Sequence, residues 1–424
     1  GGGPARRAAA SAVDRPAIPI GEVDVRRAVA RPTGVPEFDR VLGGGIVPGA
    51  VVLVAGEPGI GKSTLLLDVA ARAARSGDHG DRKVLYVSGE ESSAQVRTRA
   101  ERIEAMARSL YLASETDLAT VLGQIDALQP ELVIVDSVQT ISSAEVEGSA
   151  GNVSQVREVA ASLIQVAKAR GIAVLLVGHV TKDGSIAGPR VLEHLVDVVV
   201  QFEGDRHSRL RLVRAVKNRF GPTDEVGCFD LSDVGIVGLA DPSALFLSGR
   251  TAAVAGTCVT VTLEGRRPLV TEVQALVTAS TLSTPRRATS GLDTARVNMI
   301  LAVLDKRAAA PIGGSDAYLS TVGGVRLTEP AADLAITLAL AGAITDRPLP
   351  HGTIALGHAG RAGELRPGTG AHRRLAEAAR LGFTRAVVPP GVAGAGPVPP
   401  GLHIVESATV SEAVGRGLYD GVTR

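Results

Sequence analysis

The chain has 424 residues, a formal net charge of +1 at pH 7 and a hydrophobic content of 45%. This length allows two domains with sizeable cores, and the almost neutral charge excludes a general electrostatic attraction to polyanions. Because aromatic residues make up only 2% of the chain and tryptophan is absent, the cores must be built from Val, Leu, Ile and Ala. Any contact with nucleic acid must therefore come from local basic surfaces.

The cysteine content and the hydropathy pattern narrow the class of protein further. Two cysteines, Cys228 and Cys258, are too few for a disulfide framework or a four-cysteine zinc site, so zinc is not expected in this chain. No apolar run reaches the length of a membrane span, and the opening "GGGPARRAAASAVDRP" lacks the apolar segment of a signal peptide. We therefore expect a cytoplasmic protein with no membrane partner, in which residues 1–30 form a flexible arm.

Residues 51–64, "VVLVAGEPGIGKST", have the pattern of a buried strand, a glycine-rich loop and the start of a helix. In such a P-loop the backbone N–H groups cradle phosphates, a lysine reaches the β and γ oxygens, and the next hydroxyl binds Mg²⁺. Lys62 and Ser63 occupy these positions, which predicts ATP and Mg²⁺ as cofactors. A glycine-rich turn that matches by chance is disfavoured by the strand and helix on either side. The expected nucleotide-binding residues are Gly56, Glu57, Pro58, Gly59, Ile60, Gly61, Lys62, Ser63 and Thr64.

Polar residues at the ends of three other apolar segments complete the predicted ATPase site. "ELVIVDSVQT" places Asp136 after a strand apolar enough to be buried on both faces, where it would hold Mg²⁺ together with Ser63. "KVLYVSGEESSAQV" ends in Glu90 and Glu91, either of which could polarise the attacking water or complement a helix N-terminus. "IAVLLVGHVTKDG" brings His179 to the same sheet edge, either as a sensor of the γ-phosphate or as a structural histidine.

Strand and helix patterns alternate between residues 51 and 200, which predicts an α/β fold with a mostly parallel sheet and helices on both faces. We expect this P-loop ATPase domain to cover residues 31–242. Residues 243–424 contain alternating strand patterns and amphipathic helices, which predict a second domain of the α+β class.

Several motifs occur in an order that points to one family. They are "GEPGIGKST", "YVSGEES", "VDSVQT", "SQVRE", "VGHVTKDGSIAGPRVLEHLVD" and "VKNRFGPTDEVGCFDL". With these motifs, the chain from about Arg31 to its C-terminus resembles the RadA (Sms) family of bacterial DNA-repair proteins. Members of that family usually begin with a four-cysteine zinc finger, which this chain does not contain.

The resemblance implies a RecA-like ATPase core, a C-terminal domain similar to the Lon protease domain, and a homo-hexameric ring. It also implies DNA-dependent ATP hydrolysis, with helicase and branch-migration activity on single-stranded DNA and branched recombination intermediates. The RecA recombinase would be the protein partner.

The same resemblance assigns a role to "KNRFG", residues 217–221, at the ATP site of a neighbouring subunit or in DNA-coupled activity. Lys217 and Arg219 alternate on an extended segment and so point the same way. Cations that reach across a subunit boundary stabilise the charge that develops on the γ-phosphate, which makes these two residues catalytic candidates. The alternative is a basic strand edge that only resists aggregation.

Two segments rich in Gly, Ser and charged residues, 142–158 and 181–194, follow strands on the phosphate side. In RecA-like ATPases the equivalent loops line the central channel, so the resemblance implies that Arg157, Lys182 and Arg190 contact DNA. Neither segment contains an aromatic residue, which predicts contacts with phosphates rather than stacking on bases. Mobile surface loops are the alternative.

A further basic run, "RHSRLRLVRAVKNR", alternates charged and apolar residues. We expect Arg206, Arg209 and Arg211 to lie on a solvated face of the sheet rather than on DNA.

The second domain lacks the residues of its implied relatives' peptidase site. Lon proteases use a Ser–Lys pair in which the lysine deprotonates the serine hydroxyl. Here the serine position falls at Ala331 or Ala332 and the lysine position near His372, so we expect oligomerisation rather than peptidase activity. The candidates for an additional DNA surface, or for solvated charge, are Arg286, Arg287, Lys306, Arg307, Arg373 and Arg374.

The leading hypothesis is an ATP-driven DNA motor in recombinational repair. The alternative is an ATP-gated ring or clamp that holds or loads repair partners on DNA without translocating. An ATP-dependent peptidase is disfavoured by the missing serine.

Overall fold

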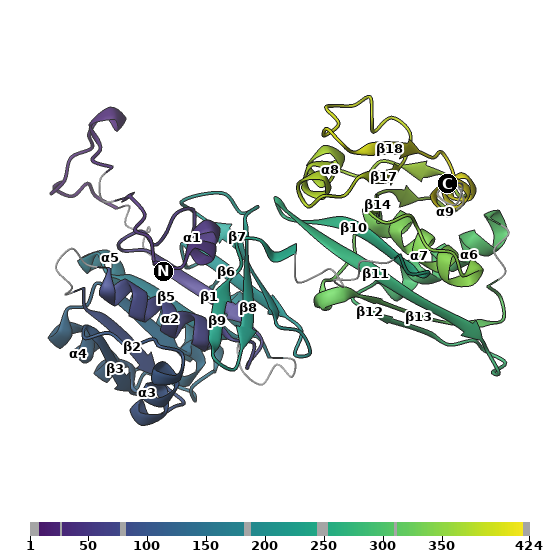
Figure 1. Cartoon of the computed structure of the whole chain (residues 1–424). Coiled ribbons are helices and arrows are strands. Elements are labelled where there is room, and N and C mark those ends of the chain that lie inside the picture. The colour runs from purple at the N-terminus through teal and green to yellow at the C-terminus, as the bar shows by residue number, and fades with distance from the viewer. Residues whose placement is uncertain are drawn as a thin grey trace, which may run out of the picture.

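The structure is a computed structural model that describes residues 8–25, 28–76, 82–181, 188–243, 253–308 and 312–418. These residues form two β-sheets, each covered by its own helices, in two bodies that lie next to each other (Figure 1). We call the body around the nine-stranded sheet the first domain and the body around the seven-stranded sheet the second domain. Within the described ranges, no helix combines the length and the apolar character needed to cross a membrane.

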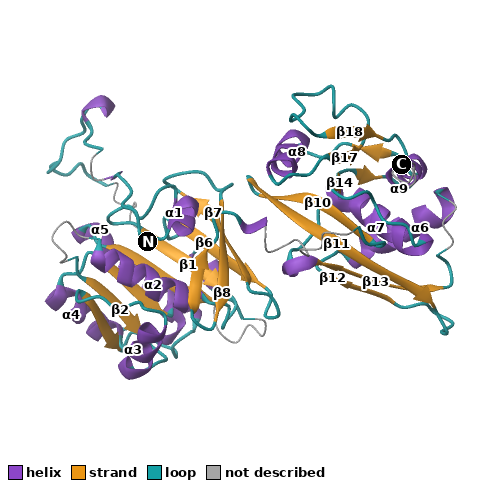
Figure 2. Cartoon of the chain, viewed as in Figure 1, coloured by secondary structure: helices purple, strands orange, loops and turns teal. Residues whose placement is uncertain are grey.

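The first domain alternates strands and helices along the chain until β6 and then continues with strands alone, as Figure 2 shows. Its strands are β1 (Val51–Gly56), β2 (Val84–Ser88), β3 (Leu110–Ser114), β4 (Leu132–Asp136), β5 (Ala173–His179), β6 (Val198–Gly204), β7 (Leu210–Asn218), β8 (Val226–Ser232) and β9 (Gly235–Gly238). Its α-helices are α1 (Pro36–Leu42), α2 (Lys62–Arg75), α3 (Ser93–Arg102), α4 (Leu118–Leu128) and α5 (Val153–Arg170).

The central parallel strands β1, β2, β4 and β5 are buried on both faces of the first sheet because they carry nearly continuous apolar runs. In β1 all six residues are buried, and alternate side chains enter different cores. Val52 and Val54 pack with apolar residues of α1, α2 and α3, whereas Val51 and Leu53 pack with those of α4 and α5. This arrangement confirms the predicted α/β fold.

The strand order of the first sheet is β3-β2-β4-β5-β1-β6-β7-β8-β9. The strands from β3 to β6 are parallel, whereas β7, β8 and β9 are each antiparallel to the strand before them. The carboxyl ends of β1, β2, β4 and β5 therefore meet at one edge of the sheet, where α/β proteins place their ligands.

Short polar side chains start the helices that follow this edge. Ser92 and Gln95 form a capping box at α3, Asp117 caps α4, and Asn152 caps α5. Each cap satisfies backbone N–H groups that have no partner within the helix. These capping residues therefore fix where α3, α4 and α5 begin after the loops at this edge of the sheet.

The second domain has a mixed sheet with helices on both faces. Its strands are β10 (Thr257–Glu264), β11 (Arg267–Ala279), β12 (Arg287–Ser290), β13 (Ser315–Thr321), β14 (Thr353–Ala355), β17 (Arg385–Val388) and β18 (His403–Glu406), in the order β12-β13-β11-β10-β14-β17-β18. The two-stranded ribbon β15 (His358–Ala359) and β16 (Leu365–Arg366) lies outside this sheet. Its α-helices are α6 (Thr294–Arg307), α7 (Asp333–Thr345), α8 (Ala371–Arg380) and α9 (Val410–Leu418).

Two separate cores hold these elements together. Residues of α6, α7 and α9 share one hydrophobic cluster, and residues of α8 belong to another, which includes β14 and β17. The last strand of the first sheet ends at Gly238 and the first strand of the second begins at Thr257. The boundary that we expect between residues 242 and 243 stays a prediction.

A buried ion pair joins the two domains. Arg267, at the start of β11, donates from Nη1 to Glu37 Oε1 on α1, and the two side chains are only 6% and 5% exposed. Its Nη1 also donates to the backbone carbonyl of Val226, and its Nη2 donates to those of Leu239 and Ala240. Removing either side chain would leave the other charge buried without solvent or partner.

More exposed ion pairs surround this contact. Among the described residues, these pairs are Arg214 with Glu264 at 2.7 Å, Arg266 with Asp224 at 2.9 Å and with Glu225 at 3.9 Å, and Arg380 with Asp241 at 3.0 Å. Ser208, in the turn between β6 and β7, also donates to the carbonyl of Gly323 at 2.7 Å. The turn beside the first domain's P-loop is thus linked directly to the second domain.

Candidate ATP-binding site

The P-loop joins β1 to α2, and its lysine is held by the loop itself. Lys62 Nζ donates to the carbonyl oxygens of Gly56 and Glu57 at 2.7 and 2.6 Å. The residue is 2% exposed, and burial lowers the pKa of its ammonium group to about 8, although the carboxylates of Asp136 and Glu57 oppose this shift. An incoming phosphate would give this poorly solvated cation a fully charged partner in place of two carbonyl oxygens.

Two of the loop glycines are required by close packing. Gly61 has a φ of +111°, and a Cβ there would lie 3.1 Å from Leu231. A Cβ on Gly56 would lie 2.9 Å from the carbonyl oxygen of Phe202. Residues of β6 and β8 thus pack directly against the loop, and only glycine leaves room for that contact at these two positions.

Arg211 of β7 supports the loop from the same side. Its Nε donates to the carbonyl oxygen of Ile60 at 2.8 Å, and the residue is 5% exposed. Its Nη1 donates to three further carbonyls, those of Asp205, Ser208 and Leu210. The guanidinium group therefore joins the P-loop to the turn between β6 and β7.

The expectation that Arg211 lies on a solvated sheet face is wrong. The alternation along the strand predicts one face for Arg209 and Arg211, but only Arg209 is exposed, where it pairs with Asp230 at 2.7 Å. Gly204 makes the burial of Arg211 possible, because a Cβ at that position would lie 2.4 Å from Arg211 Cδ. The pairing of Gly204 with Arg211 depends on the register of β6 and β7 and is invisible in the sequence pattern.

Asp136, at the end of β4, receives two hydroxyl groups. Ser63 Oγ donates to Asp136 Oδ2 at 2.5 Å, and Tyr86 Oη donates to the same oxygen at 2.8 Å. Burial and the neighbouring carboxylate of Asp136 raise the pKa of Tyr86 well above its ordinary value, so the phenol stays a donor. The hydroxyl of Ser63 and the carboxylate of Asp136 are oxygen donors of the kind that Mg²⁺ prefers, and their contact fits one shared ion. Sequence reasoning missed Tyr86, whose strand position looks like any other core position.

The two glutamates after β2 have different surroundings. Glu91 pairs with Arg99 of α3, with Oε1 and Nη1 2.6 Å apart. The pKa of Glu90 is raised, first by burial and then by the carboxylates of Asp136 and Glu91. The charge of Asp136 therefore acts on Glu90, whereas Glu91 is bound to an arginine on the following helix.

His179, at the end of β5, lies beside Asp136. Its Nε2 is 4.0 Å from Asp136 Oδ1, and within the described part of the chain its buried Nδ1 has no hydrogen-bond partner. Burial and the charge of Lys62 lower its pKa, so the imidazole is neutral at pH 7. Gln139 holds the histidine backbone from both sides, because its Oε1 accepts from His179 N and its Nε2 donates to His179 O. Sequence reasoning did not single out Gln139, which follows the Asp136 strand in the "VDSVQT" motif.

The structure places Lys217 and Arg219 away from the P-loop of their own chain. Lys217 Nζ donates to the carbonyls of Glu193 and Val196 at 3.0 and 2.9 Å, and Arg219 Nη1 donates to Asp197 Oδ1 at 3.0 Å. Asp197 Oδ2 in turn accepts from the backbone N–H of the first residue of β1. Both cations therefore lie at the start of β1, whereas the P-loop follows its end.

The candidate DNA-binding residues lie next to the loops after β4 and β5. Arg157 is exposed in the first turns of α5, and Arg190 is exposed in the 3-10 helix η4 (Pro189–Leu192), which contacts α5. Lys182 lies outside the described residues. The buried Gln155 shapes the loop before α5, because its side chain bonds to the backbone of residues 143, 146 and 148.

In the second domain the structure corrects one basic candidate. Arg374 is 2% exposed, donates to the carboxylate of Glu329 and to the carbonyl of Val261, and so belongs to no surface. Ala331 and Ala332, where the resemblance implies the peptidase serine, are both buried and carry no nucleophile.

The glycine-rich loop on a parallel sheet, with its buried lysine and with its hydroxyl in contact with the strand-end aspartate, defines a P-loop ATPase with a RecA-like core. Residues 17–185 match a family model described as an AAA domain. In a comparison of folds, a KaiC-like protein from Pyrococcus horikoshii OT3 matches 50% of this chain and 99% of its own length, with a TM-score of 0.40 and 19% identity.

Curated relatives match almost the whole chain. The DNA repair protein RadA of Mycobacterium tuberculosis is 57% identical over 97% of this chain and 85% of its own length. Those of Mycolicibacterium smegmatis and Listeria monocytogenes are 57% and 45% identical, over 97% and 95% of this chain and 87% and 88% of their own lengths. This chain belongs to the RadA family of DNA repair proteins.

Proposed function

We propose that this protein is an ATP-driven motor that moves on single-stranded DNA and processes branched recombination intermediates alongside RecA. The proposed active form is a homo-hexameric ring. Family membership supports a role in DNA repair. The buried Lys62 of the P-loop and the contact between Ser63 and Asp136 support the hydrolysis of ATP in the presence of Mg²⁺.

The observation that carries the ring proposal is the path of β7. Arg211, near one end of this strand, bonds to the P-loop, whereas Lys217, near the other end, bonds to the segment that precedes β6. Six residues of strand place these two cations about 20 Å apart, at roughly 3.3 Å per residue. Lys217 is too far from the P-loop of its own subunit to contact a phosphate bound there, so we assign it to the ATP site of a neighbouring subunit.

Each polar residue of the site then has a distinct role. Lys62 would leave its two loop carbonyls and bind the β and γ phosphates, and Ser63 and Asp136 would hold Mg²⁺, which neutralises phosphate charge. Glu90 would orient and polarise the attacking water, because Glu91 is occupied by Arg99. His179, neutral and buried, would report the γ-phosphate through its contact with Asp136.

DNA would be bound by the phosphates of its backbone. Arg157 and Arg190 are exposed on adjoining elements at the edge of the sheet that carries the ATP site. Two cations per subunit are weak alone, but repetition around a ring would raise the effective affinity without any new kind of contact. The resulting binding would be insensitive to sequence and would weaken as salt rises.

A subunit-mixing experiment tests the proposal. Lys62→Ala subunits lack the phosphate-binding lysine, and Lys217→Ala subunits lack the cation proposed to act on a neighbour. If Lys217 acts across a boundary, mixing the two inactive variants restores ATPase activity, because some interfaces then combine an intact P-loop with an intact Lys217. If the mixture stays as inactive as its components, the proposed interface is wrong.

Assays on DNA then test the motor itself. A motor separates strands and moves branch points only with hydrolysable ATP, and Lys62→Ala abolishes both activities while DNA binding remains. A ring that binds DNA and hydrolyses ATP at full rate without strand displacement or branch migration would be a clamp or loader instead. Peptide cleavage by the purified protein would contradict the proposed loss of peptidase activity.

A further inference from the structure

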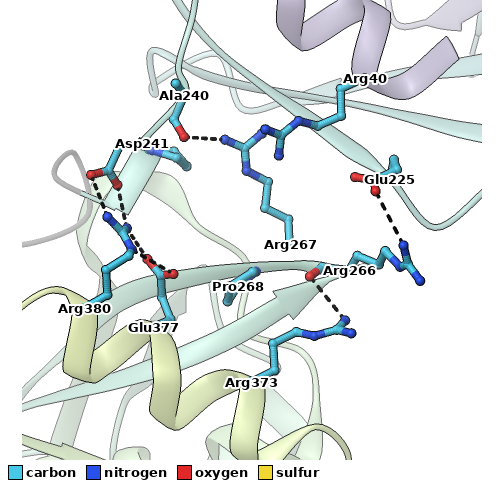
Figure 3. Close-up of a pocket in the computed structure, with 11 residues that line it drawn as sticks. Arg40, Glu225, Ala240, Asp241, Arg266, Arg267, Pro268, Arg373, Glu377 and Arg380 are labelled. Carbon is cyan, nitrogen blue, oxygen red and sulfur yellow. Dashed lines mark hydrogen bonds and ion pairs between the residues drawn. The ribbon is translucent and has the colours of Figure 1, made fainter. Parts of the chain in front are cut away.

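A pocket of about 530 Å³ lies at the boundary between the two domains (Figure 3). Its charged lining consists of five arginines and three carboxylates, an excess of two positive charges. The arginines are Arg40, Arg266, Arg267, Arg373 and Arg380. The ATP site contains none of them.

Three of these arginines already have partners. Arg267 donates four hydrogen bonds, to Glu37 and to three carbonyls, as described above. Arg380 binds Asp241 with two N–H groups and also pairs with Glu377. Arg266 pairs with Asp224 at 2.9 Å, outside the lining of the pocket, and with Glu225 of the lining at 3.9 Å. The neighbouring carboxylates are thus used to position these three arginines.

Arg40 and Arg373 retain most of their donor capacity. Among the described residues, Arg373 makes a single hydrogen bond of 3.4 Å to the carbonyl of Arg266, and Arg40 pairs only with Glu37, at 3.5 Å. Each guanidinium group carries five N–H donors, so several on each side chain are open to a ligand. The two residues come from different domains, Arg40 from α1 and Arg373 from α8, and approach the pocket from opposite sides (Figure 3).

We propose that this pocket binds a small anion with two or more phosphate groups, which Arg40 and Arg373 hold from the two domains. Planar guanidinium groups match phosphate oxygens in two-point contacts, which favours phosphate over a monovalent anion. The volume lies within the range of about 300–1,000 Å³ that is usual for small-molecule sites. Because no aromatic residue lines the pocket, the ligand is recognised by its phosphates and not by a base.

A ligand bound to both domains stabilises the arrangement in which they lie together, since it binds only when both arginines face the pocket. The pocket adjoins the buried pair of Glu37 and Arg267, so occupancy would reinforce the contact that already joins the domains. The site would thereby couple the concentration of a phosphorylated small molecule to the rigidity of the domain junction.

Calorimetric titration of the full chain with tripolyphosphate, without Mg²⁺, tests this assignment. The P-loop also binds phosphates, so we expect two sites per chain in the unaltered protein. The Lys62→Ala variant should retain only the pocket site, and the Arg40→Ala/Arg373→Ala double variant only the P-loop site. Affinity at the pocket should fall at least tenfold in the double variant and should weaken with salt.

Matched controls separate a specific site from general charge. Arg361→Ala removes an exposed arginine from a turn of the second domain and should leave both sites intact. Unchanged ATP-analogue binding by the double variant shows that it is folded. Two sites in the double variant, or none in Lys62→Ala, would overturn the assignment. Displacement of tripolyphosphate from Lys62→Ala by a short oligonucleotide would overturn the choice of a small ligand in favour of DNA.

Discussion

Arg211 and Ile60 are 151 positions apart in the sequence and are joined by a hydrogen bond of 2.8 Å from Nε to the P-loop carbonyl. The same guanidinium group holds three carbonyls at the turn between β6 and β7, and Ser208 of that turn donates to the second domain. A single buried side chain thus connects the phosphate-binding loop, the start of β7 and the domain junction. A displacement of the P-loop on nucleotide binding would therefore act, through Arg211 and Ser208, on the contact with the second domain.

Replacing Arg211 by alanine should weaken ATP binding about tenfold and lower the free energy of unfolding by about 1–3 kcal/mol, because buried carbonyls lose their donor. Arg211→Lys should restore little, since one ammonium group cannot reach all four acceptors. Equilibrium titration with a fluorescent nucleotide measures the first effect and chemical denaturation the second. Arg209→Ala, on the same strand but exposed, is the control and should change neither. Equal effects of the two alanine variants would contradict the supporting role of Arg211.

Nucleotide binding without Mg²⁺ should depend on pH through Lys62. Its pKa is lowered to about 8 in the free protein, so the ammonium form that binds phosphate is lost as pH rises above that value. ADP affinity should be level below pH 8 and should fall by about tenfold per unit above it. Binding should also take up protons near pH 8, because the bound phosphate raises the pKa again. Titration calorimetry in buffers of different ionisation enthalpy measures this uptake, and its absence in Lys62→Arg is the control.

The two glutamates after β2 should differ in their effect on hydrolysis. Glu90→Gln should lower kcat by about 10²–10⁴-fold with ATP binding preserved, which is the usual contribution of a general base. Glu91→Gln removes the partner of Arg99 and should lower kcat much less, with a modest loss of stability. Steady-state ATPase rates together with nucleotide affinities separate the two. A larger loss of kcat in Glu91→Gln would reverse the assignment.

Tyr86 should act as a positioning residue for the Mg²⁺ ligand. Tyr86→Phe removes the hydroxyl that donates to Asp136 Oδ2 and keeps the buried ring. We expect a several-fold rise in the Mg²⁺ concentration needed for half-maximal ATPase activity, with a stability change of about 1 kcal/mol. A Mg²⁺ titration at saturating ATP measures this. An unchanged Mg²⁺ requirement would show that Tyr86 only packs in the core and does not position Asp136 for Mg²⁺.

The buried pair of Glu37 and Arg267 should control access to Cys228. Glu37 Oε1 also accepts from Cys228 N at 3.1 Å, and burial raises the pKa of this thiol to about 12. At pH 8 the native protein should therefore react with thiol reagents only on unfolding. Arg267→Ala should destabilise the protein by about 3–5 kcal/mol and expose Cys228 to a chromogenic disulfide reagent. A variant that unfolds at the same temperature and stays unreactive would show that the pair contributes little.

Short sequence motifs predicted the fold class and the position of the P-loop. The α/β class and the P-loop follow from patterns of adjacent residues, such as the glycines and lysine of residues 56–64 and the apolar run before Asp136. These features are local, because phosphate binding needs a particular loop and a buried parallel strand needs an apolar run. In a sheet of parallel strands the carboxyl ends of those runs lie at one edge. The approximate position of the candidate site could therefore be predicted from the sequence too.

The sequence alone determined which chemistry this protein carries, whereas the tertiary structure decided which residues share in it. Strand register placed Arg211 under the P-loop and Lys217 at the opposite end of the sheet, although six positions of one basic run separate them. Burial removed Arg374 from the surface, and an ion pair with Arg99 distinguished Glu91 from Glu90. These outcomes depend on contacts between segments far apart in the chain, and neither periodicity nor composition records which distant backbone a long charged side chain will reach.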